Sequence, residues 1–175
     1  GTALSGYLVE SISGQPFNEY CQNNIFEPLC MHSSAWFMAE LDSNQVARPH
    51  TFQGGNYQPQ PHYGFADYPN GQLRSNVFDL AHFMVAILNG GKLGANRILN
   101  STTVAEMLTP QIPNLLVTQG LNWYQEEIFH DNGSAWLFGH NGGELGASTE
   151  LYIDPANGLG FAVLANGEGD ALFIC

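Results

Sequence analysis

The chain has 175 residues, a length that favours one domain. It carries 16 acidic and 4 basic residues, giving a formal net charge of −12, and 44% of its residues are hydrophobic. This apolar content predicts a packed core and argues against a disordered chain. The four basic residues are too few to form a basic stripe, which argues against nucleic acid or an anionic membrane as a partner.

The sequence also predicts neither a membrane span nor a metal site. Its longest apolar run, residues 83–88, is far shorter than the ~20 residues that a bilayer-spanning helix needs. The six histidines share no ligand spacing, and the three cysteines (Cys21, Cys30 and Cys175) form neither a zinc motif nor a disulfide framework. We therefore expect no cofactor.

The N-terminal segment is patterned as an amphipathic helix that ends at Gly14. Its apolar stripe consists of Leu4, Tyr7, Leu8 and Ile12. A second helix is predicted over residues 17–26, after Pro16. Because the chain begins inside a helix pattern and ends on the apolar run 171–175, we expect both ends to be truncated and the segment to belong to a larger fold.

Residues 42–71 are rich in glycine, proline and aromatic residues. The sequence predicts a packed loop that lines a cleft, because such a long loop in a compact domain is usually functional or disordered. Tyr63 and Tyr68 are the candidate substrate-binding rings. The alternative is that these rings simply pack over the core.

The clearest predicted helix covers residues 77–88, with Asn76 as its N-cap and a glycine pair after its end. Its apolar stripe consists of Leu80, Phe83, Met84, Ile87 and Leu88. Another helix is expected to begin near Thr102 or Thr103 and to stop at Pro110.

The remaining segments favour strands. Residues 121–124 and 135–138 have strand-like composition, residues 147–153 alternate strictly, and residues 159–165 are apolar throughout. The alternation places Ala147, Thr149, Leu151 and Ile153 on one face. Residues 154–158 have turn composition, so the last two strands should form a hairpin. The predicted fold class is an α/β (α+β) sandwich, an antiparallel sheet flanked by helices.

The stretch Gly139-His140-Asn141-Gly142-Gly143 is the most informative for chemistry. Glycines at a strand entry allow the backbone to approach a ligand closely. The N–H group of Gly142 or Gly143 would stabilise an oxyanion, and His140 would orient a substrate or move a proton. The alternative is a glycine-rich strand entry with a solvated histidine.

Several segments, taken together, resemble the serine β-lactamase and penicillin-binding-protein superfamily in its class C and esterase-like branch. They are Gly1-x-x-Leu4-x-Gly6 through Phe17, Ile25-Phe-Glu-Pro-Leu29-x-Met31, Asn70-Gly71-x-Leu73-x-Ser75-x-x-x-Asp79-Leu80, Asn89-Gly-Gly-Lys-Leu-Gly94, Thr103–Pro110, and Gly139–Gly143 through Asn166. The match runs in order along almost the whole chain and is weak only over 42–68 and 111–135. Cys30 departs from the glycine that is usual in this family's Pro-Leu-Gly-Met.

This resemblance implies acyl transfer and a β-lactamase/transpeptidase-like fold, of which residues 1–175 would be the C-terminal part of a single domain. His140-Asn141-Gly142 would be the family's third active-site motif, and Gly143 would supply an oxyanion N–H. His140 and Gly143 are thus the implied catalytic residues, and Asn141 and Gly142 are counted as substrate-binding. The nucleophilic Ser-x-x-Lys and the Tyr-x-Asn are expected upstream, since Lys92 is the only lysine and is preceded at the required spacing by Asn89.

Two function classes remain open: a segment of a serine hydrolase, or a non-catalytic scaffold or binding protein that kept the fold. The expected partners are a small-molecule or peptide acyl substrate and the N-terminal half of the same protein. The sequence leaves β-lactam, peptide and ester substrates open. A histidine in the third motif argues only against a dedicated β-lactamase, because a permanent ammonium holds a β-lactam carboxylate better than an imidazole does. The resemblance also favours a periplasmic or secreted location.

Overall fold

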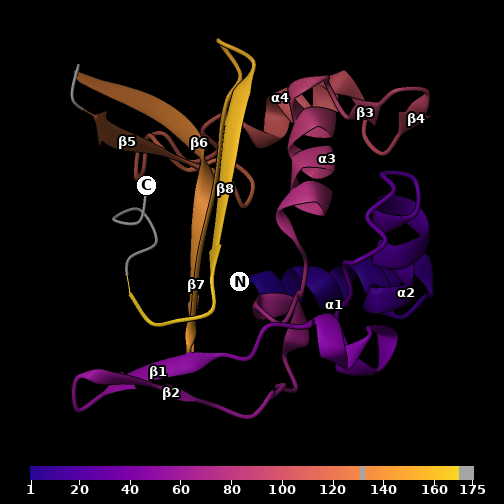
Figure 1. Ribbon diagram of the computed structural model, residues 1–175. Coiled ribbons are helices and arrows are strands. Elements are labelled where there is room, and N and C mark those ends of the chain that lie inside the picture. The colour runs from indigo at the N-terminus through magenta and orange to yellow at the C-terminus, as the bar shows by residue number, and fades with distance from the viewer. Residues whose placement is uncertain (131–132, 170–175) are drawn as a thin grey trace.

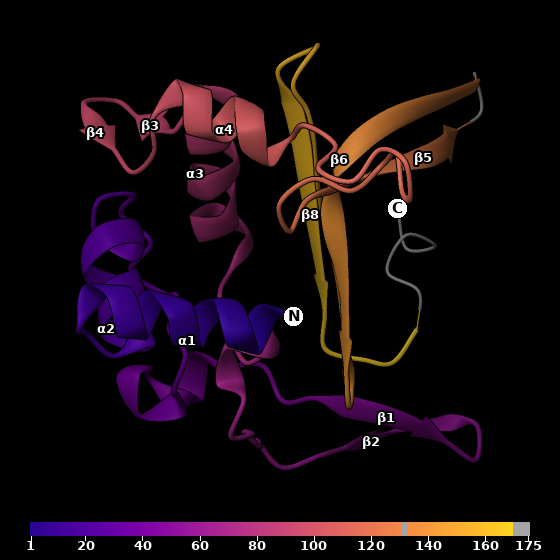
Figure 2. The same ribbon diagram turned by 180° about the vertical axis from the view of Figure 1, so that it is seen from behind.

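Helices occupy one side of the molecule and a four-stranded sheet the other (Figures 1 and 2). The computed structural model describes residues 1–130 and 133–169. The sheet is antiparallel with the order β5-β6-β7-β8, and helix α3 packs along β8. The predicted fold class, an antiparallel sheet flanked by helices, is confirmed.

The four strands are β5 (Tyr124–His130), β6 (Gly133–Glu144), β7 (Ala147–Asp154) and β8 (Leu159–Ala165). The predicted hairpin is present, with β7 and β8 antiparallel and Asp154 opposite Leu159. In its turn the Asp154 carboxylate accepts hydrogen bonds from the N–H groups of Ala156 and Asn157. Gly158 completes the turn with a φ of 66°, a conformation that favours glycine.

Strand β6 runs through the glycine-rich stretch, which the sequence had indicated only as a strand entry. Strand β5 pairs only with the first part of β6, and this pairing stops at Tyr124 and Gly139. Strand β7, in contrast, pairs with β6 as far as Glu144. The segment 140–144 therefore has β7 on one edge and no described strand on the other. Of the predicted strand at 121–124, residues 121–123 form a bend and only Tyr124 belongs to a strand, as the first residue of β5.

Helix α3 (Val77–Leu88) matches its prediction. The Asn76 side chain accepts hydrogen bonds from the N–H groups of Phe78 and Asp79, and each bond is 2.9 Å long. Helix α4 (Ser101–Met107) begins slightly earlier than predicted and ends before Pro110. Across residues 1–130 and 133–169, no helix has both the length and the apolar character that a bilayer crossing requires.

Two apolar clusters hold the helices to the rest of the molecule. The first joins Met84 and Ile87 of α3 to Ile153 of β7, together with Val104 and Trp123. The second lies on the helical side and consists of Cys21, Phe26, Leu29, Met31, Trp36 and Ala86. Burying each large side chain stabilises the fold by ~1.5–3 kcal/mol. Because both clusters include residues of α3, this helix is the centre of the described core.

Helix α1 (Thr2–Ser13) matches the first predicted helix, but its apolar stripe does not face the described core. Leu4, Tyr7, Leu8 and Ile12 are 60%, 62%, 50% and 85% exposed. The helix packs through its small face instead: Gly6 is buried, and a Cβ atom there would lie 2.7 Å from the Pro69 side chain. The amphipathic pattern was therefore a correct sign of a helix, but the apolar face is not its buried one here.

The second predicted helix, 17–26, is two pieces in the structure. Helix α2 (Phe17–Cys21) continues as the π-helix η1 (Gln22–Phe26). Cys30 follows with a φ of 55°, a left-handed conformation. This conformation accounts for the glycine that the resembling family usually carries at this place.

The segment 42–71 is not only a loop, because it contains the hairpin of β1 (His50–Gln53) and β2 (Asn56–Pro59). Gly54 and Gly55 form its two-residue turn with φ values of 58° and 82°, the sign that a type I′ turn requires. The hairpin lies beside the lower end of β7 (Figure 1), where the His50 N–H donates to the Gly146 carbonyl. Short 3-10 turns flank it: η2 (Met38–Glu40), η3 (Ser43–Gln45) and η4 (Tyr68–Asn70).

Candidate active site

Residues 140–143 occupy the part of β6 that extends beyond β5. The Asn141 N–H donates a hydrogen bond to the hydroxyl of Tyr124 on β5 (3.2 Å), so it points away from β7. Because successive N–H groups of a strand point to opposite edges, the Gly143 N–H is directed toward this same free edge. The local strand geometry thus offers a backbone donor at an edge where a ligand can bind.

A cavity of about 650 Å³ borders this edge of β6. All four residues His140, Asn141, Gly142 and Gly143 line it. Its other walls come from Thr2 at the start of α1, from Trp36, from Leu80 of α3 and from the segment around Leu73 and Ser75. The start of α1 lies between the helices and the sheet in both views (Figures 1 and 2). The cavity therefore lies at the junction of the helical side and the sheet.

Strand β7 forms one wall of this cavity. Ala147, Thr149 and Leu151, the face that the alternation marked as apolar, line the cavity, whereas Ser148 and Tyr152 on the other face are buried. The apolar face therefore borders the cavity at one end of the strand and joins the core at its other end, through Leu151 and Ile153. Two acidic residues, Glu144 and the buried Glu150, are among the described lining residues, and no lysine or arginine is.

The glycines of the motif differ in what surrounds them. A Cβ atom at Gly142 would lie 2.6 Å from the Thr149 hydroxyl oxygen, whereas a Cβ atom at Gly143 would meet nothing within 4 Å. At Gly139 a Cβ atom would lie 2.1 Å from the Leu151 carbonyl oxygen and 2.3 Å from the Tyr152 ring. Gly139 is thus required for packing, and Gly143 has open space in front of its backbone.

The His140 side chain is exposed and lies against an aromatic ring. The imidazole stands edge-on to the Tyr124 ring, with centroids 5.1 Å apart and an interplanar angle of 64°. Its Nδ1 is within hydrogen-bonding distance of the Asn141 carbonyl oxygen. The exposed ring is therefore held against Tyr124 at the wall of the cavity.

Similarity to known proteins agrees with this geometry. The sequence profile of the Beta-lactamase family matches residues 1–173. The chain belongs to the Beta-lactamase family. Its relatives in this family are β-lactamase-like serine hydrolases, and the resemblance inferred from the short motifs is confirmed.

Two curated members of the family align over most of the chain. The "Putative D-alanyl-D-alanine carboxypeptidase" of Escherichia coli O157:H7 is 27% identical over 93% of this chain and 43% of its own length. "Penicillin-binding protein 4" of Amycolatopsis lactamdurans is 25% identical over 95% of this chain and 46% of its own length. The chain spans less than half the length of these relatives.

Solved structures of the family share the fold. The octameric penicillin-binding protein homologue from Pyrococcus abyssi superposes with a TM-score of 0.78 at 26% identity, covering 95% of this chain and 37% of that one. The D-amino acid amidase from Ochrobactrum anthropi gives a TM-score of 0.74 at 22% identity, covering 95% of this chain and 48% of that one, and supports the fold alone.

Tyr63 lies in a smaller cavity of about 160 Å³ that adjoins the first. The two cavities share Gly71, Leu73, Glu144 and Ala147. The Tyr63 hydroxyl donates to the Leu145 carbonyl oxygen, and burial together with the charge of Glu144 raises the pKa of Tyr63. Tyr63 thus borders the candidate site, and its contact with substrate stays a prediction.

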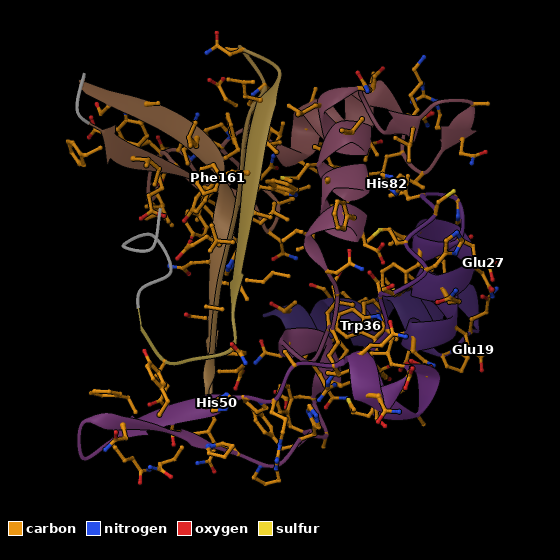
Figure 3. All side chains as sticks on the ribbon, viewed as in Figure 1. Glu19, Glu27, Trp36, His50, His82 and Phe161 are labelled. Atoms are coloured by element: carbon orange, nitrogen blue, oxygen red, sulfur yellow. The ribbon has the colours of Figure 1, made fainter. Side chains whose placement is uncertain are left out.

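Tyr68 lies elsewhere. Its ring packs among Phe17, Trp36 and Phe37, with centroid distances of 6.1, 5.8 and 4.8 Å, and its hydroxyl accepts a hydrogen bond from the Asn18 N–H. Trp36, labelled in Figure 3, belongs to this ring cluster and also lines the cavity. Tyr68-Pro69-Asn70 also has the letters of the family's Tyr-x-Asn, but this packing keeps the Tyr68 ring out of the described cavity wall. The geometry supports the packing alternative for Tyr68.

A hydrogen-bond network that sequence reasoning missed supports another wall of the cavity. Ser75 lines the cavity, and its hydroxyl bonds with that of Ser34 (2.7 Å), which donates to the buried Asp79 carboxylate (2.8 Å). The Ser33 N–H donates to the same carboxylate oxygen. The Ser75-x-x-x-Asp79 pattern was a signal for this contact, but its partners Ser33 and Ser34 are more than 40 residues away in the chain.

Another missed group surrounds Tyr124. The hydroxyl of the buried Tyr152 donates to the Glu126 carboxylate, and Tyr124 lies next to both residues at the start of β5. Burial, then hydrogen bonding with Glu126 and Tyr124, raises the pKa of Tyr152. Only the pairing of three strands places these residues together.

Within the described ranges, no group of three or more His, Cys, Asp or Glu side chains is arranged to hold a metal ion.

Proposed function

We propose that this chain is part of a serine hydrolase that cleaves an ester, amide or β-lactam through an acyl-enzyme. The observation that carries the proposal is the Gly143 N–H at the free edge of β6, next to a cavity that His140 also lines. Membership of a serine hydrolase family supports it, as do relatives named a carboxypeptidase and an amidase. The nucleophilic Ser-x-x-Lys is assigned to the part of the protein upstream of residue 1.

The proposed reaction has two steps. The serine oxygen bonds to the substrate carbonyl carbon, and the carbonyl electron pair becomes an oxyanion that the Gly143 N–H stabilises. Collapse of this intermediate breaks the bond to the leaving group, which takes the proton that the serine loses. Water then attacks the acyl-enzyme in the same way, releasing the acid and restoring the serine.

His140 and Asn141 would orient the acyl substrate at this edge, with Gly142 allowing close approach. An imidazole at this position also serves as a proton carrier near neutral pH. The cavity has a volume typical of small-molecule sites. The acidic residue Glu144, with no lysine or arginine among the described lining residues, favours ester or amide substrates over the anionic β-lactams.

The test compares Gly143→Pro with Gly143→Ala in the full-length protein. Proline removes the N–H that the proposal assigns to the oxyanion, and because this N–H points away from β7, no ladder bond is lost. Alanine keeps the N–H, and its Cβ atom has open space. We expect kcat for p-nitrophenyl esters to fall about 10²–10³-fold in Gly143→Pro and only a few-fold in Gly143→Ala.

Labelling of the wild-type protein with a fluorophosphonate gives the reference. If the protein is labelled but Gly143→Pro remains as active as Gly143→Ala, the oxyanion assignment is wrong. If the wild-type full-length protein neither reacts with the fluorophosphonate nor hydrolyses esters, D-amino acid amides or a chromogenic cephalosporin, the proposed hydrolase is overturned in favour of a scaffold or binding protein.

A further inference from the structure

We propose that Tyr124 is a positioning residue of this site, which holds the free edge of β6 so that the Gly143 N–H and the His140 ring face the substrate. The inference rests on the proposed function and names a residue that neither the sequence motifs nor family membership assigns. Three contacts of Tyr124, and the residues that hold Tyr124 in place, support this role.

The position of Tyr124 in the sheet places it beside the motif. It is the first residue of β5 and lies opposite Gly139, immediately before the segment of β6 that β5 does not cover. Its hydroxyl oxygen accepts the Asn141 N–H over 3.2 Å, and its ring stands edge-on to His140. One side chain therefore replaces the missing strand along the first residues of the free edge.

The hydrogen bond from the Asn141 N–H to the Tyr124 hydroxyl determines which backbone N–H group of the free edge is left for a substrate. In the segment 140–143, which β5 does not cover, two N–H groups point away from β7, those of Asn141 and Gly143. Tyr124 takes the first, so the donor left facing the cavity is that of Gly143. Because the two groups are only two residues apart, movement of Asn141 would also move the Gly143 N–H.

Tyr124 is itself firmly held. It lies opposite Gly139, which has no side chain. On the neighbouring strand β7, Tyr152 lies opposite the same glycine, and its fully buried ring occupies the space that a side chain at Gly139 would need. The turn before β5 is closed by a hydrogen bond from the Gly120 N–H to the Trp123 carbonyl (2.7 Å), and Trp123 is in the core. Donors held on a rigid support keep their aim, which is what oxyanion stabilisation requires.

The experiment uses Tyr124→Phe and Tyr124→Leu in the full-length protein. Tyr124→Phe keeps the ring against His140 but removes the acceptor of the Asn141 N–H, whereas Tyr124→Leu removes both contacts. Tyr57→Phe and Tyr57→Leu are the matched controls, since Tyr57 lies exposed on the β1–β2 hairpin. The readouts are amide hydrogen exchange at Asn141 and Gly143, and the single-turnover rate of acylation by a p-nitrophenyl ester.

We expect Asn141 exchange to accelerate about 3–10-fold in Tyr124→Phe, the effect of losing one hydrogen bond. The acylation rate should fall by a similar factor and about 10–100-fold in Tyr124→Leu, while KM stays within about 2-fold. A purely structural tyrosine would instead lower thermal stability and leave these two amides and the rate constant unchanged. The Tyr57 variants should match the wild-type protein.

The two proposals fail separately. Unchanged Asn141 exchange in Tyr124→Phe overturns the positioning role whether or not the protein is active. Faster exchange with an unchanged acylation rate overturns the link to catalysis. A wild-type protein that is never acylated overturns the proposed function, and exchange at Asn141 still decides whether Tyr124 holds this edge.

Discussion

The Tyr63 hydroxyl donates a hydrogen bond to the Leu145 carbonyl oxygen over 2.9 Å, joining residues 82 apart in sequence. Leu145 lies in the turn between β6 and β7, directly after Gly143 and Glu144. Tyr63 belongs to the segment between β2 and η4, so this bond attaches that segment to the end of the motif strand. Together with the bond from the His50 N–H to the Gly146 carbonyl, it ties the segment 42–71 to the turn that follows the motif.

Tyr63→Phe should lower the free energy of unfolding by about 0.5–1.5 kcal/mol, because one hydrogen bond is lost and the ring remains. Urea denaturation followed by circular dichroism measures this change. Tyr57→Phe on the exposed hairpin is the control and should leave stability within about 0.5 kcal/mol of wild type. Equal effects of both variants would contradict a specific role for the bond to Leu145.

Substitutions at Tyr68 distinguish a packing role of its ring from a role in substrate binding. Because its ring packs on three aromatic rings, Tyr68→Ala should destabilise the protein by about 3–4 kcal/mol, whereas Tyr68→Phe should cost less than about 1 kcal/mol. KM of Tyr68→Phe should match that of wild type in the full-length enzyme. A several-fold rise in KM without lost stability would instead favour a substrate-facing hydroxyl.

His140→Ala should lower kcat/KM of the full-length protein by roughly 10–1,000-fold, because substrate orientation or proton transfer is lost. Thermal stability should be almost unchanged, since the imidazole is exposed at the cavity mouth. Steady-state kinetics and a melting curve make the comparison. Full activity in this variant would refute the assigned role of His140.

Gly139→Ala should be far more damaging than Gly143→Ala. The added Cβ atom would lie 2.1 Å from the Leu151 carbonyl oxygen at position 139 and would meet nothing at position 143. We expect a loss of about 1–3 kcal/mol or more at Gly139, the cost of overpacking, and less than about 0.5 kcal/mol at Gly143. Similar unfolding midpoints in urea would show that β6 and β7 are less closely paired than the structure has them.

The raised pKa of Tyr152 predicts that the protein becomes less stable at alkaline pH. Burial, then hydrogen bonding with Glu126, raises its pKa above the ordinary value of 10.0. Above that pH the unfolded chain loses the proton while the folded protein keeps it, so the free energy of unfolding should fall as the pH rises past about 10. Below it this contribution is fully present. Urea titrations at several pH values should show a shallower decline in Tyr152→Phe, and an identical decline would contradict the assignment.

Local sequence patterns were sufficient to predict those helices and strands whose ends are marked by a capping residue or a turn. Asn76 caps the helix that the periodicity placed at 77–88, and Asn157 with Gly158 turns the chain between β7 and β8. Gly54 and Gly55 were an equally clear hairpin signal, but the proline-rich surroundings favoured an unbroken loop. The motif 140–143 was also visible, because glycines beside a histidine are informative within five residues.

Residues that are neighbours in the chain were enough to predict the family, most of the secondary structure and the glycine-rich motif. Tertiary structure alone decided that the apolar face of α1 is exposed, that Tyr68 packs away from the cavity and that Tyr124 holds Asn141. Periodicity marks a face as apolar without saying what packs on it. Strand register, set by pairing between distant segments, places Tyr124 opposite Gly139 and Tyr152 beyond it.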